Sequence, residues 1–238
     1  MYANDPKASL SAVLWVTILA IGFGYFCLLI GKACHMSHSQ TYRSCWERSV
    51  SHERGGLWVA IANTLDPVLG LYANATILSH SLQLLLQGVL NIYWSATACL
   101  LVVTALGILP LCLMKNLSAL APFSAVGMVA VLTALGAMIV RYRDGSYQPG
   151  GTFYDDIPHH LQPSFGHKSR PWSTSALPFV CMVYTSFDMH YNSPSFYTEL
   201  RQASIPRFGK AVGCSFAITA AIYAAIAVTG FLTFGENA

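Results

Sequence analysis

Long stretches without charged residues occur in the chain at spacings typical of membrane-spanning helices. Residues 8–31, 116–140 and 211–235 contain no Asp, Glu, Lys or Arg, and residues 67–114 form a longer run of the same kind. A helix needs about 20 apolar residues to cross the hydrocarbon core of a bilayer. Residues 67–114 can therefore hold the end of a span that begins near Leu57, a turn near residues 88–91, and a second full span.

These patterns predict an all-α membrane helix bundle rather than a β-barrel. Barrel strands are about 10 residues of alternating polarity, whereas runs such as VVTALGILPLCLM are continuously apolar. Such a helix is stable in lipid because it satisfies its own backbone hydrogen bonds. Residues 173–197 add a further apolar segment whose single charge is Asp188. We predict six spans, at about residues 9–31, 57–80, 93–114, 117–140, 174–197 and 209–234.

The composition agrees with a polytopic membrane protein and excludes other classes. Apolar residues make up 54% and charged residues 10% of the 238 residues, whereas soluble domains carry about 25% charged residues. The net charge of +3 is too small and too scattered for nucleic-acid binding. Basic residues are more frequent around segments 32–56, 115–116 and 198–208, so we expect these on the cytoplasmic side and the long loop 141–173 outside.

Cysteine and histidine spacings give no indication of a disulfide framework, a metal or a cofactor. None of the seven cysteines lies in the 141–173 loop, and no CxxC motif occurs. His35 and His38 form one loose pair without matching ligands elsewhere. We therefore predict no metal, no cofactor and no enzyme activity.

Small residues recur in the last predicted span. Gly209 and Gly213 form a GxxxG pattern, and several alanines follow them. Small residues allow helices to approach closely in lipid, which favours a packed bundle.

Asp66 is one of two acidic residues inside the predicted spans, where ionisable groups are costly and are candidates for function. It precedes Pro67, which removes a backbone donor and tends to bend a helix. Either Asp66 takes part in ion or proton coupling, or the segment is a kink whose freed carbonyl is solvated by Asn63, Thr64 or water. The sequence leaves both open.

Asp188 lies in a more polar stretch, MVYTSFDMHYNSPSFYTEL, which also contains Pro194. A continuous helix of this composition is poorly suited to face lipid. A discontinuous helix that lines a cavity would instead offer exposed backbone groups to a substrate or an ion. The alternative is an ordinary helix that ends near Met189 and is followed by a polar inner loop.

Four stretches of the chain carry recognisable motifs in order. They are QTYRSCWERSVSHERGG, ILPLCLMKNLSALAPFSAVG, ALPFVCMVYTSFDMHYNSPSFYTELR and GFLTFGENA. The second is similar to LPL-x-x-L-K-[DN]-L-x-x-L-x-x-x-S, the third to LP-x-x-x-F-x-F-x-C-H-x-x-x-P-x-[FI]-Y-x-EL, and the last to GYLTFG. The first resembles Y-x-E-L-x-x-x-x-x-G. Together they resemble the amino acid/auxin permease family, which includes neutral and vacuolar amino acid transporters.

The resemblance implies a LeuT-like fold built from inverted repeats, of which residues 1–238 would form an incomplete amino acid transporter domain. The implied function is secondary active transport of L-amino acids, coupled to protons or sodium, in the plasma membrane or a vacuolar or lysosomal membrane. Because helices of the family have no counterpart here, the alternative is a non-transporting multi-pass protein, such as a truncated copy, a scaffold or a regulatory partner.

The resemblance also implies a substrate site in the polar stretch. His190 matches the family histidine, and Met189 replaces the cysteine before it. Ser186, Phe187 and Asp188 would then lie near the substrate together with His190, and Asp188 would hold the substrate ammonium group or accept a coupling proton. The closing P-x-x-Y-x-EL of the motif is matched by Pro194, Tyr197, Glu199 and Leu200.

Overall fold

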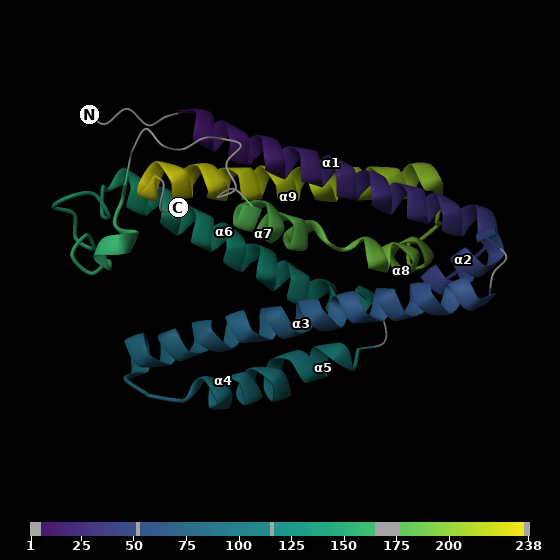
Figure 1. Cartoon of the computed structure of the whole chain (residues 1–238), viewed down its shortest axis with the longest axis horizontal. Helices are drawn as coiled ribbons and strands as arrows, with labels where there is room; N and C mark the ends of the chain where they lie inside the picture. The colour runs from purple at the N-terminus through teal and green to yellow at the C-terminus, as the bar shows by residue number, and fades with distance from the viewer. Residues whose placement is uncertain (1–5, 51–52, 115–116, 165–176, 236–238) are drawn as a thin grey trace. The chain divides into compact units, whose positions relative to one another are not determined.

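The computed structural model describes residues 6–50, 53–114, 117–164 and 177–235 (Figure 1). Within these ranges the regular structure is helical, and extended pairing is limited to one isolated bridge between Ser164 and Gly235. The α-helices are α1 (Pro6–Ser37), α2 (Tyr42–Val50), α3 (Glu53–Leu90), α4 (Ala96–Val102), α5 (Leu109–Cys112), α6 (Ala121–Arg143), α7 (Leu177–Phe187), α8 (Ser193–Thr198) and α9 (Ile205–Phe234). The shorter elements are the π-helix η1 (Val103–Ile108) and the 3-10 helices η2 (Leu117–Leu120), η3 (His159–Leu161) and η5 (His190–Asn192).

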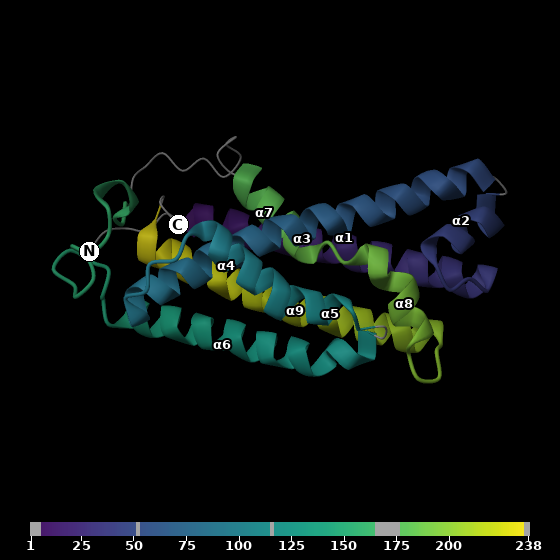
Figure 2. The ribbon, with the colours of Figure 1, turned by 90° about the horizontal axis from the view of Figure 1, so that it is seen from below.

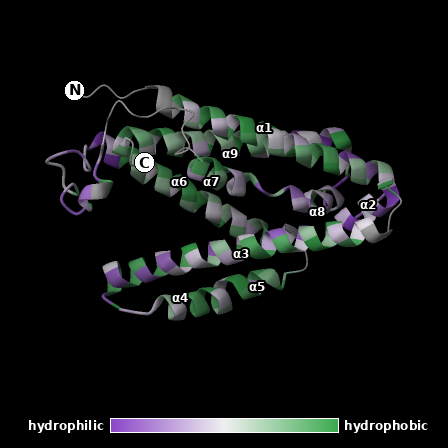
Figure 3. Cartoon of the chain, in the orientation of Figure 1, coloured by the Kyte–Doolittle hydropathy of each residue, from purple (hydrophilic) through white to green (hydrophobic). Residues whose placement is uncertain are grey.

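Three helices in the described ranges are long and apolar enough to cross a membrane. They comprise Leu10–Ser37 in α1, Ser118–Arg143 in η2 and α6, and Ile205–Phe234, which is α9. Figure 3 shows all three mainly in the colours of apolar residues. They agree with three of the six predicted spans.

The other three predicted spans are helical but do not have this combination of length and apolarity. α3 is 38 residues long, and polar positions are scattered along it in Figure 3. The apolar stretch Ala96–Cys112 is shorter than a full span. Residues 174–176 of the fifth predicted span lie outside the described residues, and the remainder is interrupted. The total of six spans therefore stays a prediction.

The chain divides into two compact units, each described here by itself. Unit 1 comprises Met1–Ile30, Ala125–His190 and Ser204–Ala238. Unit 2 comprises Gly31–Ser124 and Tyr191–Ala203. Helices α7 and α9 thus belong to unit 1 and helix α8 to unit 2, while α1 and α6 contribute to both.

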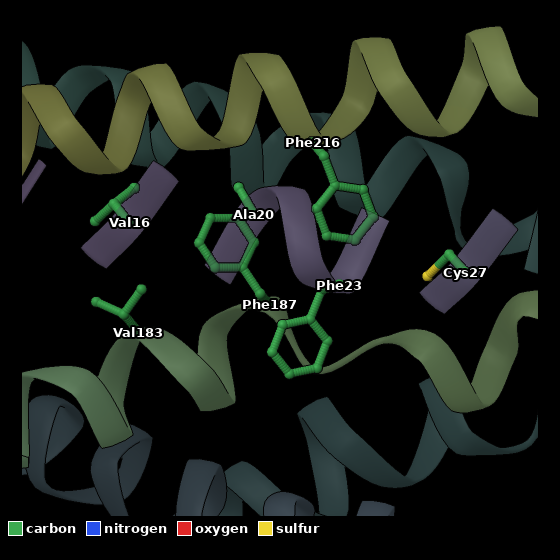
Figure 4. Packing of buried hydrophobic residues seen from close by; sticks show 7 residues of the cluster. All are labelled: Val16, Ala20, Phe23, Cys27, Val183, Phe187 and Phe216. Carbon is green, nitrogen blue, oxygen red and sulfur yellow. The ribbon is translucent and has the colours of Figure 1, made fainter. Parts of the chain in front are cut away.

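The core of unit 1 forms where α1, α7 and α9 pack together (Figure 4). Its members on α1 recur every three or four residues, which places them on one face of the helix. Phe187 is only 1% exposed, and its ring centroid lies 5.9 Å from that of Phe216 and 5.3 Å from that of Tyr223. In lipid, close packing of this kind is the main attraction between helices. The buried members are Val16, Ala20, Phe23, Cys27, Val183, Phe187 and Phe216.

The GxxxG pattern on α9 does not form a close helix crossing among the described residues. A Cβ added at Gly209 would lie 3.6 Å from Cδ2 of Leu28, which is an ordinary van der Waals contact. A Cβ added at Gly213 would meet no atom within 4 Å. Among the described residues, no neighbouring atom lies so close to Gly209 or Gly213 that an added Cβ would be excluded.

In unit 2, α3 and α4 form an antiparallel helical hairpin in which η1 also contacts α3, and α3 and α4 lie side by side in Figures 1 and 2. The turn occurs where the sequence predicts it, because α3 ends at Leu90 and Asn91 has a left-handed φ of 54°. Asn tolerates this region better than most residues. In η1 the Leu109 N–H bonds to the Thr104 carbonyl, and this wide turn precedes Pro110, which has no N–H to donate.

The segment 32–56 differs from the expected loop because much of it is helical. α1 continues to Ser37, α2 follows, and α3 begins at Glu53. α1 ends in a Schellman motif, in which His38 has a φ of 49° and the Ser39 N–H bonds to the Cys34 carbonyl at 3.0 Å. The positions of charged residues indicate where a helix leaves the bilayer. They do not indicate where the helix ends, because that depends on local backbone conformations such as this one. The predicted turn at residues 115–116 lies outside the described residues.

The long 141–173 segment is described up to Ser164, and its basic residues Lys168 and Arg170 lie outside the described residues. Its start is well defined, because Gly145 has a φ of 63° and ends α6. The guanidinium carbon of Arg141 then lies 4.5 Å from the ring centroid of Phe153. This cation–π contact folds the first part of the loop back onto the end of α6.

Candidate functional site

The fifth predicted span is interrupted at its polar stretch. α7 ends at Phe187, and Asp188 and Met189 lie outside any helix. Helical structure resumes in η5 and α8, and the Met189 N–H makes a tight bond of 2.9 Å to the Phe187 carbonyl. The stretch is therefore not one continuous helix, and both alternatives, a discontinuous helix and a helix that ends near Met189, agree with this. That the interruption lines a cavity stays a prediction.

Asp188 and His190 are paired within the interruption. Oδ1 of Asp188 lies 2.7 Å from Nδ1 of His190, and the two side chains are 13% and 32% exposed, respectively. The His190 ring also contacts Phe23 of α1, with centroids 5.9 Å apart. A carboxylate in such an apolar setting requires a partner, and His190 provides a charged one whenever its ring is protonated. The pair can therefore hold a cation or pass on a proton.

The other two predicted site residues, Ser186 and Phe187, have different local roles. Ser186 Oγ donates a hydrogen bond of 2.8 Å to the carbonyl of Met182, one turn earlier in α7. Phe187 is part of the unit 1 core and packs against α9. The structure thus brings Asp188 and His190 into direct contact, whereas it gives Ser186 a helix-bonded hydroxyl and Phe187 a packing role.

Asp66 lies on the exposed surface of α3, and Pro67 is inside this continuous helix. The Thr64 hydroxyl donates to the carbonyl of Ala60 at 2.8 Å. It therefore does not solvate the carbonyl that Pro67 leaves free, which belongs to Asn63. The role of Asp66 in coupling stays a prediction.

Contacts that sequence reasoning did not find lie in unit 2. Tyr197 Oη and His35 Nδ1 are 2.6 Å apart, and Glu199 Oε2 accepts the Ser118 N–H at 3.0 Å. The signal available in the sequence was the P-x-x-Y-x-EL motif, which contains both Tyr197 and Glu199. Their partners could not be predicted, because these lie 162 and 81 residues away along the chain.

The described residues contain no group of three or more His, Cys, Asp or Glu side chains able to hold a metal ion. In the described part of the interruption, Asp188 and His190 place a carboxylate and an imidazole in direct contact.

The three apolar helices of membrane length are typical of an integral membrane protein. A family model described as transmembrane amino acid transporter protein matches residues 9–238, and the chain belongs to that family. It is 24% identical over 163 residues to the amino acid transporter AVT6E of Arabidopsis thaliana. That match covers 66% of this chain but only 31% of the relative. No solved structure gave a significant match.

Proposed function

We propose that the protein carries out secondary active transport of L-amino acids, coupled to a proton or sodium gradient. The observation that supports this most is the Asp188–His190 pair at the interruption of an apolar helix. Family membership suggests amino acid transport, and the coupling ion and the site are our own assignment. Cofactors have no role in the proposal.

The chemistry of the interruption suits an amino acid zwitterion. The carboxylate of Asp188 offers a charge-assisted acceptor to a substrate ammonium group. Backbone N–H groups freed by a helix interruption are suited to the substrate carboxylate. His190, in contact with Asp188, can change its protonation when a cation enters or leaves, which gives the pair a means to couple transport to protons.

Ser186 and Phe187 remain part of the proposed site as the neighbours of Asp188 along the chain. Asp66 is a second proposed coupling residue because its carboxylate lies on a predicted span. We further propose a partial LeuT-like inverted-repeat fold with six spans, in the plasma membrane or a vacuolar or lysosomal membrane. The three membrane-length helices and the interruption after α7 support this architecture.

Uptake of a panel of labelled amino acids into cells that express the full-length protein tests the proposal. Asp188→Asn keeps the size of the side chain and removes its charge, so a bond to a charged partner worth about 1.5–3 kcal/mol is weakened. We expect uptake to fall about tenfold or more at low substrate concentration. Asp144→Asn, in the exposed turn after α6, is the matched control and should behave as the wild type.

The results separate the proposed roles from one another. Absence of uptake of every amino acid by the wild type would favour the non-transporting alternative. Wild-type uptake by Asp188→Asn would contradict the role of Asp188, and the same result for Asp66→Asn would contradict that of Asp66. The coupling ion is identified by replacing sodium with choline and, in a separate experiment, by removing the pH gradient. Uptake that is insensitive to both changes would contradict secondary active transport.

A further inference from the structure

Helix α8, which follows the interruption, is attached to the end of α1 by a specific side-chain contact. The hydroxyl of Tyr197 lies 2.6 Å from Nδ1 of His35, which is in the last turn of α1. The two rings also meet edge to face, with centroids 5.8 Å apart at 76°. Tyr197 is buried. The contact thus combines a directional hydrogen bond with ring packing away from solvent.

A second bond attaches the end of α8 to the helix that leads into α6. Oε2 of Glu199 accepts the backbone N–H of Ser118, in the first turn of η2, at 3.0 Å. The first four N–H groups of a helix have no partner within the helix, and its dipole favours a negative charge there. Glu199 therefore acts as an N-terminal cap supplied by a distant segment.

The support for α8 on the α1 side is itself fixed. Arg48 of α2 donates to the carbonyls of Ser37 and His38 at 2.8 and 2.6 Å, which satisfies backbone acceptors at the end of α1. His35 therefore lies on an anchored helix end. α8 has only six residues, and a helix this short is not stable without tertiary contacts.

We propose that Tyr197, His35 and Glu199 are positioning residues for transport. Their hydrogen bonds hold α8 within unit 2, and α8 follows Asp188 and His190 closely along the chain. This inference rests on the proposed function, in which these two residues bind substrate. Without the bonds the interruption samples more conformations, so its polar groups are less preorganised and the apparent KM for substrate rises.

Hydrogen exchange tests the attachment of α8 without any need for transport. In purified full-length protein, Tyr197→Phe keeps the ring and removes only the hydroxyl. A lost hydrogen bond of about 1 kcal/mol corresponds to about fivefold faster exchange of the amides in residues 193–200. Glu199→Ala should do the same, whereas the exposed Tyr72→Phe on α3 is the matched control without effect. Unchanged exchange in both α8 variants would overturn the proposal.

Uptake kinetics then test whether the attachment matters for transport. Tyr197→Phe and His35→Ala should each raise the apparent KM about fivefold, with little change in maximal rate per molecule in the membrane. His35→Asn, whose amide can occupy the place of Nδ1, should restore part of the loss. The double variant Tyr197→Phe/His35→Ala should be no worse than either single variant, because one contact is lost in each case.

The outcomes distinguish failure of this inference from failure of the proposed function. Additive effects in the double variant, or lower protein amounts with unchanged KM, would overturn the positioning role. A further outcome is that the wild type transports no amino acid while hydrogen exchange in residues 193–200 is still faster in the variants. In that case the proposed function fails, and with it the role of these three residues in transport. The attachment of α8 by their hydrogen bonds is then upheld.

Discussion

Replacement of Phe187 by leucine tests whether this residue holds the core of unit 1. The side chain is almost fully buried and makes ring contacts with Phe216 and Tyr223 at 5.9 and 5.3 Å. Leucine keeps most of the apolar volume and removes both ring contacts. Aromatic pairs contribute about 0.5–1.5 kcal/mol each beyond their buried area, so the loss should be about 2 kcal/mol. Phe187→Ala would add a cavity and cost about 3–5 kcal/mol.

The measurement is thermal unfolding of the purified protein in detergent. For a chain of this size about 1 kcal/mol shifts the midpoint by about 2–4 °C, so Phe187→Leu should lower it by about 4–8 °C. Phe123→Leu is the control, because Phe123 is half exposed on α6 and leucine is equally apolar. Equal midpoints for the wild type and Phe187→Leu would refute the packing argument. A higher KM in the variant, at equal protein amount, would show that Phe187 also contributes to substrate binding, by contact or by positioning Asp188.

Three further substitutions have expected outcomes in the same unfolding assay. Arg48→Ala removes two hydrogen bonds to the end of α1 and should lower the unfolding midpoint more than Arg43→Ala does. Arg43 makes an exposed ion pair with Glu47, which is worth about 0.3–0.5 kcal/mol. Equal shifts of the midpoint in the two variants would contradict this prediction. Gly213→Ala should leave the midpoint unchanged or raise it slightly, because the new methyl group meets no atom within 4 Å and alanine favours the helix. A clear decrease of the midpoint would show that the space beside Gly213 is not open. Gly151→Ala should lower the midpoint, because its Cβ would collide with the backbone carbonyl of Gly145, and full stability would contradict this loop conformation.

Charge-free runs were sufficient to predict the helical class and the positions of three membrane-length helices. The physical reason is that a charge in hydrocarbon is costly, so apolar length directly reflects the bilayer. The same argument did not predict where the helices end. α1 continues to Ser37 because nothing in the polar residues after position 31 prevents a helix, and it ends only where His38 adopts a left-handed conformation.

The candidate site was predictable only in part. A proline and several polar residues within one apolar span were enough to predict that the helix is interrupted or ends near Asp188 and Met189. His190 lies two residues away, so its contact with Asp188 is local. The contact between His35 and Tyr197 was not predictable, because it joins residues that are 162 positions apart and no periodic pattern relates them.

Helices α7 and α8 are held by different kinds of interaction, so we expect them to open at different costs in free energy. α7 is held through Phe187 and its aromatic neighbours in a buried core, so we expect it to open together with the rest of unit 1. α8 is a single short helix held through the hydroxyl of Tyr197 and the carboxylate of Glu199. We therefore expect Phe187→Leu to lower the global unfolding midpoint, and Tyr197→Phe to increase local opening in α8 with little effect on that midpoint. Equal changes of the global midpoint in the two variants would contradict this difference between α7 and α8.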